Sequence, residues 1–486
     1  MNHSITSFVY SSAASMARLV RKKAISPVEL IRAHLDRIEA LNPALNAFVH
    51  VRHEEALRDA IEAEAAVMRG EERPLLGVPV SIKCCIDVAG LRCTAGSRLR
   101  SDYVAASDAT LVHRLKNAGA IILGNTNAAE MLMAYDTENL LHGRTSNPWD
   151  LDCTPGGSSG GEAAAIASGM SAAGIGSDGG GSIRVPAHFS GICGLKPTPG
   201  RIPATGHFPA SVGPFAMMGV VGPMARTIED LRLVLKAIAG ADIADPMAAD
   251  YTMTSVPELD QVRVGFFEDD ERGGATTETQ AAVRGAVEAL QEAGLHLEQF
   301  LPDELERARE LWHTLFVRVA GGMLVAGEVV GRRSELSSRL KNFLEIAAAP
   351  QALTADELLH TLFARDELRA HLLKQMEKYQ VLVAPVCTGP AFRHGEGGWD
   401  DGYSTNYIRD MRYSQWFNIL GNPAAVVPVG RSPYGLPIGV QVIGRPYEEM
   451  LVLRVAGEIE KRFGWKEPPM NWAQAPSARE EFRHAT

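Results

Sequence analysis

The sequence predicts a mixed α/β fold built around one large β-sheet. Segments with helical periodicity alternate along the chain with short apolar segments typical of buried strands. Near the C-terminus, two β-type segments (423–430 and 438–445) flank a turn-rich stretch and indicate a β-hairpin. The 486 residues are 46% hydrophobic and 22% charged, a composition that supports a large apolar core.

The N-terminal part predicts two helices and then a strand. Ser26 suits a helix cap, Pro27 suits the first turn, and an apolar stripe follows at helical spacing, so we expect a helix over 26–42. A second, acidic helix is expected over 54–70. Segment 75–90 changes to the period of a strand, with Ser81 and Lys83 facing opposite to Val78, Val80 and Ile82.

The same rhythm continues to the C-terminus. A helix over 109–119 leads into a strand over 120–124, and strand, helix and strand are expected at 262–267, 279–294 and 379–386. No tandem repeat or linker divides the sequence. We therefore predict one domain over 1–486, with four parts: N-terminal helices (1–70), a core (71–240), a variable helical or α/β segment (241–377) and the C-terminal part of the sheet (378–486).

Charge and cysteine usage narrow the class of partners. The net charge of −10 is spread without a basic patch, which argues against binding to nucleic acid or to an anionic membrane. The six cysteines include the adjacent pair Cys84 and Cys85 but no C-x-x-C, so we expect reduced, packed thiols and no metal site. The sequence shows neither signal-peptide features at its start nor an apolar stretch of the roughly 18 residues that a membrane span needs. We expect a cytoplasmic enzyme.

Residues 156–200 are unusually rich in glycine. They hold 13 of the 46 glycines, whereas even spreading would place about four there. Apolar residues interrupt the run, which argues against a flexible linker. Such a density predicts tight turns or a close approach of the backbone to a ligand.

Two familiar motifs within this region lack their usual context. Residues 174–179 fit the dinucleotide-binding pattern G-x-G-x-x-G, but a helix is expected over the preceding residues 161–173, and 195–203 contain no acidic residue for a ribose. Residues 156–160 fit G-x-S-x-G, the nucleophile elbow, yet the preceding 148–155 has the composition of a loop instead of a strand. Both interpretations are therefore disfavoured.

A third interpretation joins two serines and a lysine. Ser158 and Ser182 each lie among glycines, and Lys83 lies in an apolar strand with no adjacent carboxylate. Burial would lower the lysine pKa, and a neutral lysine can act as the general base that a serine nucleophile needs. The backbone N–H groups of residues 179–182 could hold an oxyanion. This chemistry requires no metal and no cofactor.

These motifs resemble the amidase signature family. The resemblance is carried by Lys83 in GVPVSIK, by GGSSGG and by GSDGGGSIRVPA, and it extends over 24–240 and 378–460. It implies a single α/β/α unit around a large mixed β-sheet. It also implies that Ser182 is the acylated nucleophile, that Ser158 bridges to the base Lys83 through a cis peptide, and that the oxyanion hole consists of Gly179, Gly180 and Gly181.

The resemblance also suggests supporting and substrate-binding residues. Asp178 and Arg184 would fix the glycine loop, and Ser159 is expected to be a structural loop hydroxyl that supports the site. Substrate contacts are expected from Met131, Tyr135 and Gly157, and pocket walls from 131–136, from 207–218 and from a helix over 310–327. The sequence departs from the family at Cys84 and Cys85, where polar residues are usual, and at Gly179, where threonine is commoner.

We therefore expect hydrolysis of a C–N bond in neutral, hydrophobic or aryl small-molecule amides, anilides or carbamates, the last being a urethanase-like activity. The alternative is the glutaminase (A) subunit of a tRNA-dependent amidotransferase. Val185 after Arg184, and the segment AMMGVVGP at 216–223, both favour a stand-alone amidase. The natural substrate stays open, as does the choice between a monomer and a homodimer.

Overall fold

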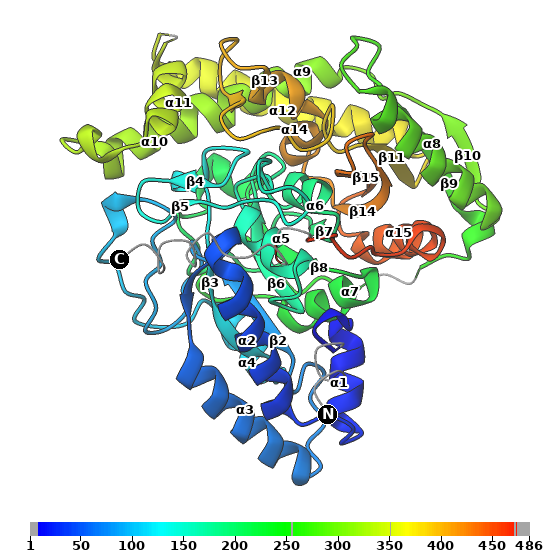
Figure 1. The fold of residues 1–486 in the computed structure, drawn as a ribbon. Coiled ribbons are helices and arrows are strands. Elements are labelled where there is room, and N and C mark those ends of the chain that lie inside the picture. The colour runs from blue at the N-terminus through cyan, green and yellow to red at the C-terminus, as the bar shows by residue number, and fades with distance from the viewer. Residues whose placement is uncertain (1–7, 254–255, 350, 471–472, 474–486) are drawn as a thin grey trace.

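One eleven-stranded β-sheet runs through the molecule (Figure 1). The structure, a computed structural model, describes residues 8–253, 256–349, 351–470 and 473. In their order across the sheet, the strands are β1 (Phe48–Val51), β3 (Ile121–Thr126), β2 (Pro79–Lys83), β6 (Ala173–Asp178), β8 (Val220–Ala225), β7 (Cys193–Lys196), β14 (Ala424–Arg431), β15 (Pro437–Gly444), β11 (Val381–Pro385), β9 (Arg263–Phe266) and β10 (His296–Gln299). Two small ribbons pair β4 (Glu138–Asn139) with β5 (Gly143–Arg144) and β12 (Gly397–Gly398) with β13 (Thr405–Asn406).

The sheet is mixed, as the sequence predicts. Strands β3, β2 and β6 are mutually parallel neighbours, and so are β11, β9 and β10. The strands between these two groups pair antiparallel, and so does the edge strand β1. The predicted C-terminal hairpin is β14 with β15.

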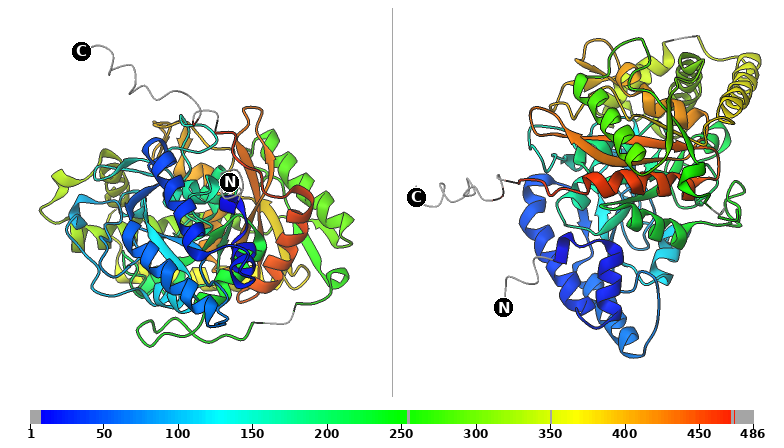
Figure 2. Two further views of the ribbon diagram at one scale, coloured as in Figure 1. Left: turned by 60° about the horizontal axis from the view of Figure 1, so that its bottom comes forward. Right: turned by 90° about the vertical axis from the view of Figure 1, so that its right-hand side faces the viewer.

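Helices cover the sheet on both faces. Their bounds are α1 (Ala13–Arg21), α2 (Pro27–Leu45), α3 (His53–Met68), α4 (Thr110–Asn117), α5 (Gly160–Ala167), α6 (Arg184–Ser190), α7 (Ile228–Ile238), α8 (Thr277–Glu292), α9 (Leu305–Trp312), α10 (Gly321–Leu324), α11 (Ser338–Ala348), α12 (Ala355–Gln375), α13 (Tyr407–Asp410), α14 (Arg412–Ile419) and α15 (Glu449–Phe463). Helices α1, α2 and α3 lie at one end of the molecule and α9 to α12 at the other (Figures 1 and 2).

Two hydrophobic cores form because successive strand residues face opposite sides of the sheet. In β14, Ala425 and Val427 enter the core shared with α7, α8 and α15, whereas Ala424 and Val426 enter the core shared with α6, α9 and α14. The result is the α/β/α layering that the family resemblance implies.

The predicted N-terminal helix is α2. Ser26 caps it, and the Ser26 side chain and Glu29 form a capping box, which satisfies N–H groups that a helix start leaves unpaired. The strand predicted within 75–90 is β2, and both of its faces are buried. Segment 241–377, expected to be helical or α/β, supplies β9, which matches the strand predicted over 262–267, and the edge strand β10, which was not predicted.

Two local expectations need correction. The helix expected to run up to residue 173 ends at Ala167, and the glycine-rich residues that follow form strand β6. The helix expected over 310–327 is not uniformly α-helical, because π-helical turns occupy His313–Ala320 and Val325–Val329. Within the described residues, no helix combines the length and apolar character needed to span a membrane.

Candidate active site

The parallel strands bring the sequence-predicted groups to one edge of the sheet. Lys83 is the last residue of β2, and Ser177 and Asp178 end the neighbouring strand β6. Parallel strands present their carboxyl ends at the same edge, where loops form binding sites. The Ser158 and Ser182 loops both reach this edge, directly before α5 and α6.

Lys83 is fully buried and contacts two hydroxyls. Its Nζ lies 2.7 Å from Ser158 Oγ and 3.0 Å from Ser177 Oγ, and its side chain has 0% exposure. Burial lowers the pKa of Lys83 from its ordinary value, because transfer out of water penalises the charged form. In the described part of the chain no carboxylate forms an ion pair with it. The neutral amine is therefore easier to populate here than at an exposed lysine.

The Ser158 loop is tightly packed. The Gly157–Ser158 peptide bond is cis, as the resemblance implies. A side chain at Gly157 has no space, because its Cβ would lie 2.6 Å from the Asp136 nitrogen. Ser159 Oγ donates to the Ser177 carbonyl at 3.3 Å and accepts from the Ser177 N–H at 3.4 Å. Ser159 thus ties this loop to the end of β6.

Ser182 shares a cavity with Ser158. The Ser159 N–H donates to the Ser182 carbonyl at 3.3 Å and holds the two serine loops together. Within the described residues no hydrogen bond joins the hydroxyls of Ser158 and Ser182. Lys83, Ser158 and Ser182 therefore lie close together. The described residues form the hydrogen bond from Lys83 to Ser158, but not the one between the Ser158 and Ser182 hydroxyls.

The three glycines expected in the oxyanion hole are not equivalent. The Gly181 N–H donates to Asp178 Oδ1 at 2.7 Å, so it is not free for an oxyanion, and the expected role of Gly181 is corrected on that ground. The N–H groups of Gly179, Gly180 and Ser182 have no acceptor among the described residues. These three amides are the donors available to a ligand oxygen.

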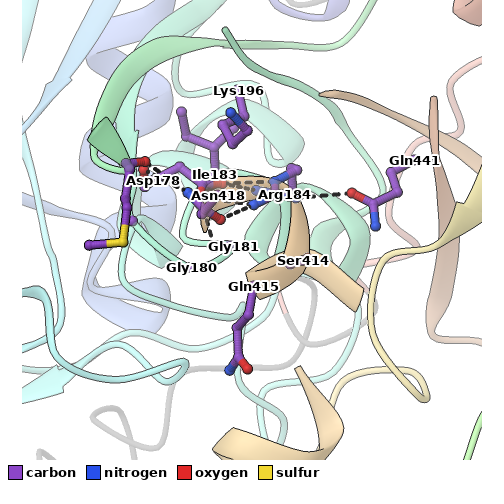
Figure 3. A network of polar contacts seen from close by, with 12 residues as sticks. Asp178, Gly180, Gly181, Ile183, Arg184, Lys196, Ser414, Gln415, Asn418 and Gln441 are labelled. Carbon is purple, nitrogen blue, oxygen red and sulfur yellow. Dashed lines mark hydrogen bonds and ion pairs between the residues drawn. The ribbon is translucent and has the colours of Figure 1, made fainter. Parts of the chain in front are cut away.

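Asp178 and Arg184 organise the glycine loop (Figure 3). The Asp178 carboxylate accepts hydrogen bonds from the N–H groups of Gly181 and Ile183 and forms an ion pair with Arg184 at 3.1 Å. Burial alone would raise the pKa of Asp178, but Arg184 outweighs it and the pKa is lowered. Arg184 also donates to Gln441 at 3.0 Å and to Asn418. Elements far apart in sequence thereby fix the loop.

A narrow cavity of about 30 Å³ lies at the two serines and adjoins a wider apolar cavity of about 220 Å³. All three predicted segments contribute to the walls: Met133 from 131–136, Phe215 from 207–218 and Phe316 from 310–327. Met133 and Phe215 line both cavities. Access to Ser182 therefore passes between apolar side chains.

Three residues expected to contact substrate do not line either described cavity. Met131 is fully buried, and the chain turns there through positive φ values at Met131 and Leu132, which presents Leu132 and Met133 instead. Tyr135 lies behind the loop, with its hydroxyl on the Gly180 carbonyl at 2.6 Å. Gly157 faces the backbone of Asp136. Their contact with substrate therefore stays a prediction that these cavity walls do not support.

His207 is a wall residue whose state the sequence did not predict. Its Nδ1 lies 2.9 Å from the Pro209 carbonyl oxygen, which can only accept, so Nδ1 carries the proton. Burial lowers the pKa of His207 to about 4, which keeps the ring neutral. It adds no cationic group to the cavity.

Sequence reasoning also missed Ser177, Trp312, Asn418 and Gln441. Ser177 could have been found, because it directly precedes Asp178 at the end of the glycine-rich strand. The other three bind residues of the glycine loop or of α6 that lie more than 130 positions away in the sequence. Trp312 binds Gly179, Asn418 binds Asp178 and Gln441 binds Arg184. Local pattern carries no signal for such contacts.

Comparison with known proteins agrees with this geometry. The family model described as Amidase matches residues 29–453. The chain is 33% identical over 476 residues to the A subunit of glutamyl-tRNA(Gln) amidotransferase from Geotalea daltonii, covering 92% of this chain and 96% of that one. It is 35% identical over 467 residues to indoleacetamide hydrolase of Bradyrhizobium diazoefficiens, covering 93% and 86%. The solved structure of a bacterial aryl acylamidase superimposes with a TM-score of 0.84 at 26% identity, covering 96% and 99%.

Proposed function

The chain belongs to the amidase family, and on that premise we propose that it is a stand-alone hydrolase of neutral, apolar or aryl amides, anilides or carbamates. The observation that carries the proposal is the buried Lys83, 2.7 Å from Ser158 Oγ, beside a cavity into which Ser182 also opens. A base, a bridging hydroxyl and a nucleophile are thus available without any cofactor.

The proposed reaction begins with proton transfer. Neutral Lys83 accepts the Ser158 proton, Ser158 accepts the Ser182 proton, and Ser182 Oγ bonds to the substrate carbonyl carbon. The N–H groups of Gly179, Gly180 and Ser182 hold the resulting oxyanion. As the C–N bond breaks, Ser158 returns a proton to the departing nitrogen, and Lys83 reprotonates Ser158. Water then attacks the acyl-enzyme by the same relay and releases the acid.

This relay requires a hydrogen bond between the hydroxyls of Ser158 and Ser182, which is not among the hydrogen bonds of the described residues. Hydrogen bonds of this kind often tighten only when substrate binds. A substrate carbonyl seated on the glycine amides would confine the Ser182 hydroxyl to the side of the cavity that Ser158 also lines.

The cavity walls support a neutral substrate. No lysine or arginine is among the described residues that line either cavity. Asp178 is ion-paired with Arg184, and His207 is neutral. The narrow cavity at the two serines therefore offers a charged substrate no free counter-ion. Apolar walls bind by buried area, at roughly 25 cal/mol per Å². The indoleacetamide hydrolase and the aryl acylamidase, by their names, act on aryl-bearing amides.

The alternative is a glutaminase subunit of an amidotransferase. Its support is the 33% identity to the A subunit over nearly both full lengths. Free glutamine carries an α-carboxylate and an α-ammonium group, and burying either without a partner is costly. The lining described above supplies no cation for that carboxylate, which disfavours this alternative.

A substrate panel on the purified full chain tests the proposal. We expect an anilide, indole-3-acetamide or an aryl carbamate to give a higher kcat/KM than glutamine, and Ser182→Ala to lose about 10³-fold or more in kcat. The control is Ser171→Ala. The buried Ser171 hydroxyl donates to the Ala173 carbonyl at the start of β6, outside the cavity, so this variant also loses one buried serine hydroxyl. Glutamine as the best substrate would favour the alternative, and near-normal activity of Ser182→Ala would refute the assigned nucleophile.

A further inference from the structure

Three side chains hold successive carbonyl groups of the glycine loop. Asn418 Nδ2 donates to the Asp178 carbonyl at 3.2 Å, Trp312 Nε1 donates to the Gly179 carbonyl at 2.9 Å, and the Tyr135 hydroxyl donates to the Gly180 carbonyl at 2.6 Å. In a trans peptide the C=O and the following N–H point in opposite directions within one plane. A donor that fixes a carbonyl therefore also aims the next N–H.

This relation assigns one amide to each donor. Asn418 aims the Gly179 N–H, Trp312 aims the Gly180 N–H, and Tyr135 aims the Gly181 N–H, which is already bound to Asp178. The 179–180 peptide bond is trans. Gly180 is buried, yet its N–H has no acceptor in the described part of the protein. A buried, unpaired N–H is unfavourable, so its direction indicates a site that a ligand oxygen completes.

Trp312 is held firmly enough to aim this amide. It is the last residue of α9, its side chain is fully buried, and its ring stacks on Phe316 at 4.7 Å with an interplanar angle of 12°. Phe316 in turn stacks on Phe215 at 5.5 Å. A Cβ on Gly180 would lie 2.6 Å from Trp312 Cζ2, so the indole packs directly on the loop.

We propose that Trp312 is a positioning residue for the amidase reaction: its indole N–H holds the Gly179 carbonyl so that the Gly180 N–H faces the oxyanion. This inference rests on the proposed function. Trp312 touches neither the substrate carbonyl nor the nucleophile in this scheme, and it acts only through the Gly180 amide. It belongs to segment 241–377, which carries no recognisable family motif.

The test compares kcat with KM in matched indole variants. Trp312→Phe keeps an aromatic ring but loses the donor, and Trp312→β-(3-benzothienyl)alanine replaces only the N–H by sulfur, which protects the fold. We expect kcat for an anilide to fall about tenfold in both variants, with KM within about twofold. Without the indole N–H the Gly180 amide is less well oriented, and this amide stabilises the oxyanion of the transition state more than it binds the substrate. Affinity for an arylboronic acid, which forms a tetrahedral adduct with a serine nucleophile, should fall in parallel.

The control is Trp149→Phe. The Trp149 indole donates to the Ser190 carbonyl at 2.9 Å, the same kind of bond, away from the cavities. It should change Tm without lowering kcat. An unchanged kcat and boronate affinity in the Trp312 variants, or a rise in KM alone, would overturn the assignment to Trp312. If the wild-type chain showed no Ser182-dependent amide hydrolysis, the proposed function itself would fail, and the inference with it.

Discussion

At the scale of single residues, the chemistry depends on the protonation state of Lys83. Its Nζ contacts only hydroxyls among the hydrogen-bonding partners that the structure gives it, Ser158 and Ser177, and burial lowers its pKa. A neutral amine at Lys83 can accept a proton from Ser158 while it donates to Ser177. Ser177 therefore orients the base.

Activity should depend on pH through this lysine. Because the pKa of Lys83 is lowered, the neutral, active form is populated at lower pH than for an ordinary lysine, and kcat should fall as pH falls through that lowered pKa. Lys83→Ala should reduce amide hydrolysis about 10²- to 10⁴-fold. It should reduce hydrolysis of a nitrophenyl ester much less, because a phenolate leaves without the returned proton.

The measurement is the pH profile of kcat for an anilide and for a nitrophenyl ester with the same acyl group. Lys116→Ala, which removes a surface lysine paired with Asp108 at 2.7 Å, is the control and should preserve both profiles. Equal losses for the two substrates in Lys83→Ala would mean that the lysine only supports the structure.

The residue types of the relay could be predicted from sequence, but the hydrogen bonds of the loop could not. The glycines around Ser158 and Ser182, and the position of Lys83 in an otherwise apolar strand, were enough to identify these three residues. Which amide is free is decided by the path of the loop, since Asp178 bends back onto the Gly181 N–H. The carbonyl donors Trp312 and Asn418 come from distant elements and have no local signature.

At the scale of elements, strand β6 shows why the helix before it, α5, was predicted to extend past its true end at Ala167. Its sequence, AGIGSD, lacks the alternation of a half-exposed strand because both faces are buried. The glycines serve close packing: a Cβ on Gly176 would lie 2.9 Å from Ser159 Oγ and 2.8 Å from Met224 Sδ. Helix boundaries elsewhere, such as that of α2 at Ser26, carry capping residues and were predictable.

The contact between the glycine loop and the π-helical turns explains the glycine at position 179. A Cβ there would lie 2.7 Å from Phe316 Cε2, and Gly179 is not among the glycines with positive φ. We therefore expect Gly179→Ala to lower the free energy of unfolding by about 1–3 kcal/mol through overpacking. In a Phe316→Ala background the same change should cost under about 0.5 kcal/mol, because the clash is gone.

Urea unfolding of the four chains in this cycle measures the coupling. Gly322→Ala, in α10, is the control: its Cβ would meet nothing within 4 Å, so it should not destabilise the protein. If the changes in unfolding free energy of Gly179→Ala and Phe316→Ala were additive, contact with the Phe316 ring would not be the reason that position 179 requires glycine.

At the scale of the whole molecule, the sheet joins all four parts of the sequence. Segment 1–70 contributes β1, segment 71–240 contributes β2, β3, β6, β7 and β8, segment 241–377 contributes β9 and β10, and segment 378–486 contributes β11, β14 and β15. The Arg184 contacts with Gln441 and Asn418 tie the glycine loop to the C-terminal part. Six of the eleven strands of the sheet were predicted by pattern, namely β2, β3, β9, β11, β14 and β15. Their order was not, because it follows from non-local packing that a single sequence does not display.

A buried carboxyl at the junction of β2, β3 and α5 should make global stability depend on pH. Glu162 is fully buried and accepts hydrogen bonds from Ser81 Oγ and, at 2.6 Å, from Thr126 Oγ1. Burial raises the pKa of Glu162 to about 7, despite these bonds and the nearby Lys83. The folded state therefore binds this proton more tightly than the unfolded chain does.

The sign of the effect follows from linkage. With the folded-state pKa above the ordinary 4.5, the contribution of Glu162 to stability is complete below pH 4.5 and is lost as pH rises through 7. Glu162→Gln cannot ionise, so its unfolding free energy relative to wild type should rise by up to about 3 kcal/mol between pH 4.5 and pH 8.5. Urea unfolding of both chains at the two pH values measures this difference. The exposed Glu345→Gln removes the same charge and should show no such change, and a Glu162→Gln difference that did not vary with pH would contradict a buried, protonated carboxyl at this junction.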